Sequence, residues 1–190
     1  MTPTSVIPGS LMFVATQARQ SIAESFVNAD AVILVDTSGS MAACDSRGGQ
    51  SRHDVACQEL ARLQRDMPGK LAVISFADLA EFCPSGVPAP PQGSTNLAGT
   101  LTFAKCADIE GMRFYVISDG MPDSTSEALR VAATYHVPIS TIYVGPESDT
   151  MGRAFLSQLA NASHGQSVTA DCVNELAEKM RPLLLGGNCG

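Results

Sequence analysis

Four short apolar segments divide this chain into alternating units of strand and helix. They lie at 31–35, 71–76, 114–118 and 139–144, and each is rich in Val and Ile and nearly continuous rather than alternating. Such runs are typical of strands that are covered on both faces in a parallel sheet. Because parallel strands need crossover connections, which are usually helices, the pattern predicts a doubly wound α/β fold.

Helical patterns fill the intervals between these segments. Ser51 with Asp54 resembles a capping box at the start of a helix that ends at Pro68. Ser124 with Glu127 has the same spacing and predicts another helix start. The remaining helices are expected at 11–28, 97–104, 150–161 and 172–184.

The segment 80–92 departs from this alternation because it carries four prolines. Proline cannot donate to the hydrogen-bond ladder of a sheet, which excludes a central strand here. We predict a brief edge strand at 81–83 followed by an extended loop. Another short strand is expected near 167–169.

With 190 residues, of which 45% are apolar, the chain can bury one substantial core. We expect one domain at 30–190, preceded by an extension at 1–29 that is helical and packs on it. The net charge is −7, and the 12 basic residues are spread along the chain. This distribution argues against nucleic acid or an anionic membrane surface as a partner.

The cysteines and the N-terminal segment favour a cytoplasmic protein. Six cysteines are widely spaced and form no C-x-x-C motif, so we expect reduced thiols. The segment 1–15 has no Lys or Arg ahead of its short apolar run and does not resemble a secretory signal. No apolar run reaches the length that crosses a bilayer.

Two of the apolar segments run directly into an aspartate, Asp36 after the first and Asp119 after the third. In open α/β sheets, ligands bind in the crevice beyond the carboxyl ends of the strands. We expect both carboxylates to face this crevice, together with the hydroxyls of Ser38, Ser40 and Thr95. Turn formation and helix capping are the plainer explanation for each aspartate alone. The whole set favours a metal site.

Two carboxylates and three hydroxyls, with neither histidine nor cysteine among them, suit a hard divalent cation such as Mg²⁺. Zinc prefers nitrogen or sulfur ligands. Hydroxyl ligands are neutral and leave much of the charge of the metal uncompensated. An acidic group from outside is therefore attracted to an open coordination position.

The motif DTSGSM at 36–41, Thr95 in GSTNL and Asp119 in VISDG resemble the metal-ion-dependent adhesion site (MIDAS) of von Willebrand factor type A (VWA) domains. The resemblance extends over about residues 30–184. It implies a doubly wound, mainly parallel six-stranded sheet, flanked by helices, with one short antiparallel edge strand. In one respect the chain departs from the family, because the loop 41–54 is longer and more polar than usual. We expect this loop to form a lip of the site.

The resemblance also implies a role for each site residue. Ser38, Ser40 and Thr95 would coordinate Mg²⁺, or else Mn²⁺ or Ca²⁺, directly. Asp36 and Asp119 would act directly or through water. A carboxylate from another protein would complete the octahedron, which makes the chain a metal-dependent protein-binding module.

Other polar residues near the expected crevice have simpler interpretations. Asp45 and Asp123 are interpreted as solvated loop charges, and Cys44 as an exposed loop residue. The three histidines share no ligand spacing and are interpreted as surface or capping residues: His53, His136 and His164.

Two alternative functions remain open, a Mg²⁺-dependent phosphohydrolase and a scaffold that a metal merely stabilises. A phosphohydrolase of the haloacid dehalogenase kind needs an acid two residues after its nucleophilic aspartate, but here that residue is Ser38. A nucleophile elbow, a P-loop and a G-x-G-x-x-G motif are all absent from the sequence. We therefore expect no catalytic residues.

Overall fold

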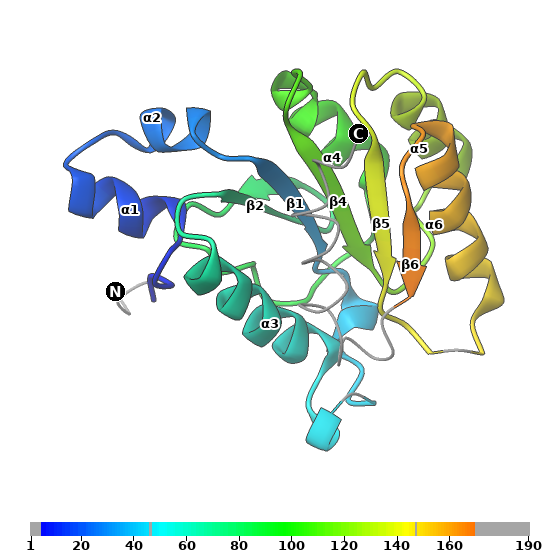
Figure 1. Cartoon of the computed structure of the whole chain (residues 1–190). Coiled ribbons are helices and arrows are strands. Elements are labelled where there is room, and N and C mark those ends of the chain that lie inside the picture. The colour runs from blue at the N-terminus through cyan, green and yellow to red at the C-terminus, as the bar shows by residue number, and fades with distance from the viewer. Residues whose placement is uncertain (1–4, 46, 147, 170–190) are drawn as a thin grey trace.

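The computed structural model describes residues 5–45, 47–146 and 148–169. Six strands form one sheet in the order β3-β2-β1-β4-β5-β6 (Figure 1). The antiparallel pair is β2 with β3, and every other pairing is parallel. This architecture confirms the expected fold class, including the short antiparallel edge strand. The strands are β1 Ala31–Asp36, β2 Leu71–Phe76, β3 Ala80–Phe82, β4 Arg113–Ser118, β5 Ile139–Tyr143 and β6 Ser167–Thr169.

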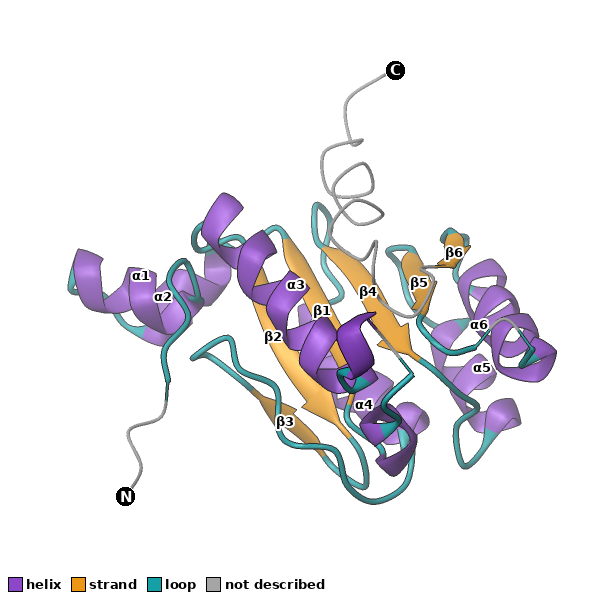
Figure 2. Ribbon diagram, turned by 90° about the horizontal axis from the view of Figure 1, so that it is seen from below, coloured by secondary structure: helices purple, strands orange, loops and turns teal. Residues whose placement is uncertain are grey.

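Helices cover both faces of this sheet. The long helix α3 packs on one face, and α4, α5 and α6 pack on the other (Figures 1 and 2). The α-helices are α1 Leu11–Ala18, α2 Ile22–Val27, α3 Arg52–Asp66, α4 Leu97–Ala104, α5 Thr125–Ala132 and α6 Thr150–Ala162. Three 3₁₀ turns connect other elements, η1 Gly39–Ala42, η2 Arg47–Gly49 and η3 Lys105–Ala107. The helix expected at 172–184 lies outside the described residues.

Strand β1 is buried along its whole length because both of its faces meet helices. Val32 and Leu34 belong to the apolar cluster that includes α4, α5 and α6. Ile33 and Val35 belong to the cluster that includes α3. Successive side chains of a strand point to opposite faces. A central strand between two layers of helices therefore needs apolar residues at every position, which explains the continuous run AVILV.

The expected helix starts at Ser51 and Ser124 are confirmed. The hydroxyl of Ser51 accepts a hydrogen bond from the main-chain N–H of Asp54 at 3.0 Å. The hydroxyl of Ser124 accepts one from Glu127 at 3.4 Å. Each bond satisfies an N–H that the helix itself cannot pair.

The N-terminal segment forms two helices where the apolar pattern predicts a single helix at 11–28. Arg19 adopts a left-handed conformation, with φ of 53°, and ends α1. Ser21 then begins α2 with a reciprocal capping box. Its N–H donates to Glu24 Oε2 at 2.7 Å, and its hydroxyl accepts from the Glu24 N–H at 3.1 Å. Helices α1 and α2 lie beside the β3 edge of the sheet, opposite α5 and α6 (Figure 2).

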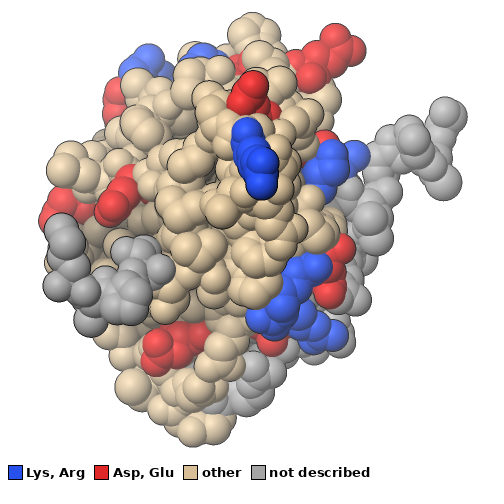
Figure 3. Space-filling view, turned by 90° about the vertical axis from the view of Figure 1, so that its left-hand side faces the viewer, with Lys and Arg blue, Asp and Glu red and all other residues tan. Residues whose placement is uncertain are grey.

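The described cysteines are free thiols, namely Cys44, Cys57, Cys83 and Cys106. Cys44 is exposed, as expected. None of the helices in the described part of the chain is both long and apolar enough to span a membrane. Figure 3 shows a face on which basic and acidic side chains lie in small separate groups among uncharged residues.

Asp108 offers a test of the stability of this fold because its carboxylate ties η3 to the start of β5. Burial alone would raise the pKa of Asp108. Hydrogen bonds from His136 N, Lys105 Nζ and Val137 N outweigh it and hold the pKa at about 2, below the 3.8 of an unfolded aspartate. We expect Asp108→Asn to lower the free energy of unfolding at pH 7 by about 2 kcal/mol.

The pH dependence of this loss follows from the direction of the pKa shift. Because the pKa of Asp108 is lower in the folded state, its ionised carboxylate stabilises the fold above pH 4. This stabilisation disappears as the pH falls toward 2. Urea unfolding of wild type and variant between pH 2 and pH 7 measures the difference. Asp30→Asn is the control, since Asp30 forms an exposed ion pair with Lys70. Equal losses in the two variants would contradict the prediction.

Candidate metal centre

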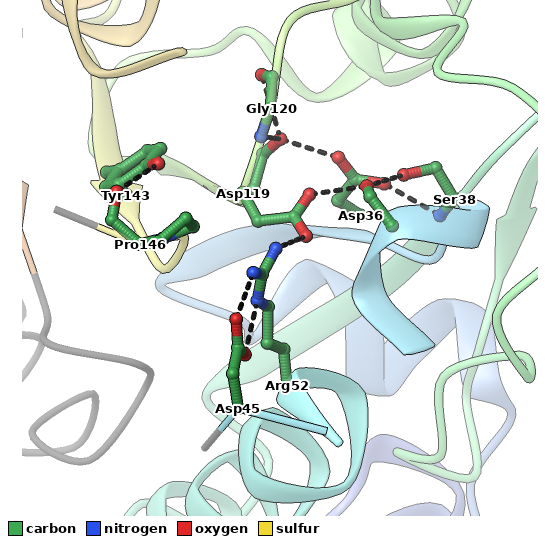
Figure 4. A network of polar contacts seen from close by, with 10 residues as sticks. Asp36, Ser38, Asp45, Arg52, Asp119, Gly120, Tyr143 and Pro146 are labelled. Atoms are coloured by element: carbon green, nitrogen blue, oxygen red, sulfur yellow. Dashed lines mark hydrogen bonds and ion pairs between the residues drawn. The ribbon is translucent and has the colours of Figure 1, made fainter. Parts of the chain in front are cut away.

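The two strand-end aspartates lie at the same edge of the sheet. Asp36 is the last residue of β1, and Asp119 directly follows Ser118, the last residue of β4. Strands β1 and β4 are parallel neighbours, with Val35 opposite Ile117. Their carboxyl ends therefore deliver both side chains to one place (Figure 4).

The carboxylate of Asp36 is completely buried beneath the loop that follows β1. Its Oδ1 accepts a hydrogen bond from the Ser38 N–H at 2.8 Å, and its Oδ2 accepts one from the Ser118 hydroxyl at 2.5 Å. Burial raises the pKa of Asp36 to about 6, against the opposing effect of the serine donors and with a small addition from the charge of Asp119. Asp36 thus holds the loop in place from below.

Three oxygen atoms form a connected series above Asp36. Ser38 Oγ lies 3.1 Å from Ser40 Oγ, and the Ser40 hydroxyl donates to Asp119 Oδ1 at 2.8 Å. Ser40 is exposed, whereas Ser38 is buried. The turn η1 carries Ser40, and its neighbour Met41 is buried in the same apolar cluster as α3. The core therefore fixes the position of a loop that carries the buried Ser38 and the exposed Ser40.

The loop before α4 lies beside the loop that follows β1. The Gln92 N–H donates to Thr37 O at 2.7 Å, and the Gly39 N–H donates to Gly93 O at 3.3 Å. Thr95 follows in this loop, and its main-chain N–H donates to Asp123 Oδ1 at 3.1 Å. Among the described residues, the Thr95 hydroxyl makes no hydrogen bond to the other four site residues. The structure thus joins four of the five expected residues through side-chain hydrogen bonds.

Arg52 is part of this network, although the sequence analysis did not identify it. Arg52 is the first residue of α3, and its Nη1 donates to Asp119 Oδ2 at 2.6 Å. Its Nε donates to Asp45 Oδ1 at 2.8 Å, and its Nη2 pairs with Asp45 Oδ2 (Figure 4). Asp45, with 44% of its side chain exposed, is an ion-pair partner rather than the solvated charge expected from the sequence.

Each partner in this ion pair shifts the protonation equilibrium of the other. The hydrogen bonds with Asp45 raise the pKa of Arg52 against the opposing effect of burial, and Asp119 adds to them. The same bonds lower the pKa of Asp45. A sequence signal for this contact did exist. A basic residue in the first turn of a helix opposes the helix dipole, and an acidic partner nearby offsets this unfavourable interaction.

The histidines differ in their surroundings. His136 is exposed, as expected, but the prediction of a surface position is wrong for His53, whose side chain is only 12% exposed. Its Nε2 lies 2.8 Å from Ala89 O and 3.5 Å from the Sγ of Cys57. Burial raises the pKa of the Cys57 thiol to about 12, which favours the protonated thiol at neutral pH.

The donor set fits a hard divalent cation. Ser38, Ser40, Asp36 and Asp119 supply only oxygen atoms, which are the ligands that Mg²⁺ and Mn²⁺ prefer. Within the described ranges, no three His, Cys, Asp or Glu side chains come together as a metal site. Hydroxyl groups would supply part of the coordination of a cation at this edge of the sheet.

Neither a protein-family model nor a curated protein sequence matches this chain. Solved structures do match it. BatB from Bacteroides thetaiotaomicron has a TM-score of 0.64 and 19% identity, over 83% of this chain and 97% of that one. The manganese-loaded TRAP protein from Plasmodium vivax has a TM-score of 0.59 and 20% identity, over 83% and 73%. A von Willebrand factor type A protein from Catenulispora acidiphila has a TM-score of 0.60 and 16% identity, over 81% and 41%. The chain has the VWA fold.

Proposed function

We propose that this chain is a divalent-metal-dependent protein-binding module that engages an acidic residue of its partner through a MIDAS. One observation carries the proposal. The hydroxyls of Ser38 and Ser40 and the carboxylate of Asp119 form a continuous series of oxygen atoms at the carboxyl edge of the sheet. Two neutral hydroxyls and one carboxylate suit a cation that keeps a coordination position open for an external ligand.

The residues of the site have different proposed roles. Asp36 is buried and orients the loop by accepting the Ser38 N–H. Ser38, Ser40 and Thr95 supply neutral oxygen ligands, and Asp119 supplies a charged one. A cation held there would attract the carboxylate of the partner, because one carboxylate and three hydroxyls leave its coordination incomplete. The manganese-loaded TRAP structure, which shares this fold, supports a divalent metal as the ligand.

The environment of Asp36 argues against the hydrolase alternative. A nucleophilic aspartate has to reach its substrate, but Asp36 is fully buried and both of its oxygen atoms accept hydrogen bonds. The general acid that would assist it two residues later is replaced by Ser38. We therefore propose a site that binds and does not catalyse.

Removing one hydroxyl tests the metal site directly. We expect Ser38→Ala to weaken Mn²⁺ binding by at least about tenfold to a hundredfold, the loss found when an outer partner that supports a metal ligand is removed. The melting temperature without metal should change little, because the Ser38 main-chain contact to Asp36 remains. Isothermal titration of metal-stripped protein measures the affinity. Ser157→Ala, at an exposed position of α6, is the matched control.

Partner binding is tested with the same variants. Immobilised protein is exposed to native lysate in Mg²⁺ and in chelator, with wild type and Ser38→Ala side by side. A partner retained only by wild type with metal supports the adhesion-type module. A partner retained under all conditions would assign a purely structural role to the metal. If Ser38→Ala left the Mn²⁺ affinity unchanged, the result would contradict the proposed metal site.

A further inference from the structure

Arg52 places a permanent positive charge against a residue that is proposed to face a divalent cation. Its Nη1 lies 2.6 Å from Asp119 Oδ2, and the side chains of Arg52 and Asp119 are almost fully buried. A guanidinium stays protonated at any physiological pH. Any cation bound at Ser40 and Asp119 therefore shares the carboxylate of Asp119 with Arg52.

Asp45 holds the other side of the guanidinium. Its two oxygen atoms accept from Nε and Nη2 of Arg52, which is the bidentate arrangement that binds arginine most strongly. The loop that carries Asp45 is anchored at its base by a hydrogen bond from the Arg52 N–H to Ala43 O at 3.1 Å. Arg52 thus pairs with two carboxylates, that of Asp119 in the proposed metal site and that of Asp45 outside it.

We propose that Arg52 competes internally with the divalent cation for Asp119, and that Asp45 sets the strength of this competition by drawing the guanidinium away. The inference rests on the proposed function of the site. The two oxygens of Asp119 have different partners, Ser40 on Oδ1 and Arg52 on Oδ2. A carboxylate that is partly neutralised in this way attracts a metal less strongly.

This competition predicts effects of opposite sign for the two partners. Removing the charge of Arg52 leaves the full negative charge of Asp119 to the cation, which binds more tightly. Removing the charge of Asp45 leaves Arg52 paired with Asp119 alone, and the cation binds more weakly. An ion pair that merely stabilised the loop would weaken metal binding in both variants, because both would loosen the same loop.

The experiment measures Mn²⁺ affinity in the metal-stripped chain of 190 residues from the free-ion signal in electron paramagnetic resonance. We expect Arg52→Gln to bind Mn²⁺ about tenfold more tightly and Asp45→Asn about tenfold more weakly, the order of magnitude for one unit charge beside a site that is open to water at Ser40. Arg62→Gln removes an exposed charge on the same helix and should bind as wild type does. Thermal melting without metal confirms that each variant is folded.

Each outcome decides between the two proposals. Weaker binding in both variants, or no change in either, overturns the competition and leaves the metal site intact. Failure of every protein to bind Mn²⁺ overturns both. If Arg52→Gln binds Mn²⁺ and wild type does not, the result supports the competition but contradicts the proposed metal-dependent function of the native chain. Arg52→Met, with an apolar side chain, replaces Arg52→Gln if that variant does not fold.

Discussion

Asp119→Ala is expected to lower the free energy of unfolding by about 3 kcal/mol in the absence of metal, the lower end of the range for a broken buried ion pair. The Asp119 side chain is 0% exposed, and its removal leaves Arg52 Nη1 facing a cavity. The loss stays at the lower end because Arg52 keeps its partner Asp45. Urea unfolding of metal-stripped protein measures the difference. The same variant should show no Mn²⁺ binding.

Two further variants separate the buried charge from other causes. Arg52→Met combined with Asp119→Ala removes both charges, and it should recover most of the stability because no charge is then left buried without its partner. Asp30→Ala breaks the exposed pair with Lys70 and should cost less than about 1 kcal/mol. If Asp119→Ala cost no more than Asp30→Ala, the ion pair would contribute nothing to stability.

Phe114→Ala is expected to lower the free energy of unfolding by about 4 kcal/mol, as other large-to-small changes at buried phenylalanines do. Phe114 lies on β4 in the middle of the sheet and is 1% exposed. Its ring and that of Tyr135 pack in a T-shaped arrangement, with centroids 5.1 Å apart and an interplanar angle of 84°. The hydroxyl of Tyr135 in turn donates to Leu101 O on α4. The cavity would therefore loosen the contacts between β4, α4 and the segment after α5.

The control for this prediction is a phenylalanine of the same fold in an exposed position. Phe103 on α4 is 50% exposed, and Phe103→Ala should change the free energy of unfolding by less than about 1 kcal/mol. Guanidinium unfolding at 25 °C measures both variants. A loss at Phe114 as small as that at Phe103 would show that β4 is not part of the cooperative core.

The sheet and most of the helices could be predicted because burial on two faces leaves a strong mark on the sequence. Strand β1 lies between two layers of helices and therefore needs an apolar residue at each position. The continuous run AVILV meets this requirement and can be recognised in the sequence. The start of α3 could be predicted from Ser51 and Asp54, since a capping bond joins residues only three positions apart. Local chemistry of this kind can be recognised without a structure.

The N-terminal segment shows how one local signal can hide another. Its apolar residues continue at helical spacing across the break at Arg19, and this pattern predicts one helix. Ser21 and Glu24 carry the capping-box spacing that begins α2, so the signal for a second helix was present in the sequence. The cap was decisive because it pairs main-chain groups that the continuous helix would have paired differently.

The ion pair of Arg52 could not be predicted from spacing alone. Arg52 and Asp119 are 67 residues apart, and the contact depends on how the long loop after η1 folds back toward β4. That loop contains Gly48 and Gly49, both with positive φ, which few other residues adopt. Sequence patterns indicate burial and local caps, but they do not indicate where a long polar loop places a charge.

The order of strands in the sheet has a consequence for the synthesis and folding of the chain. Strand β1 lies between β2 and β4, yet β4 follows it in the sequence only after α3, β2, β3 and α4. While the chain is being made, one edge of the segment AVILV remains unpaired until residue 118 has emerged. Folds dominated by such distant pairings form slowly, and their unpaired apolar strands are prone to aggregate. The yield of native protein should therefore fall as the protein concentration during refolding rises.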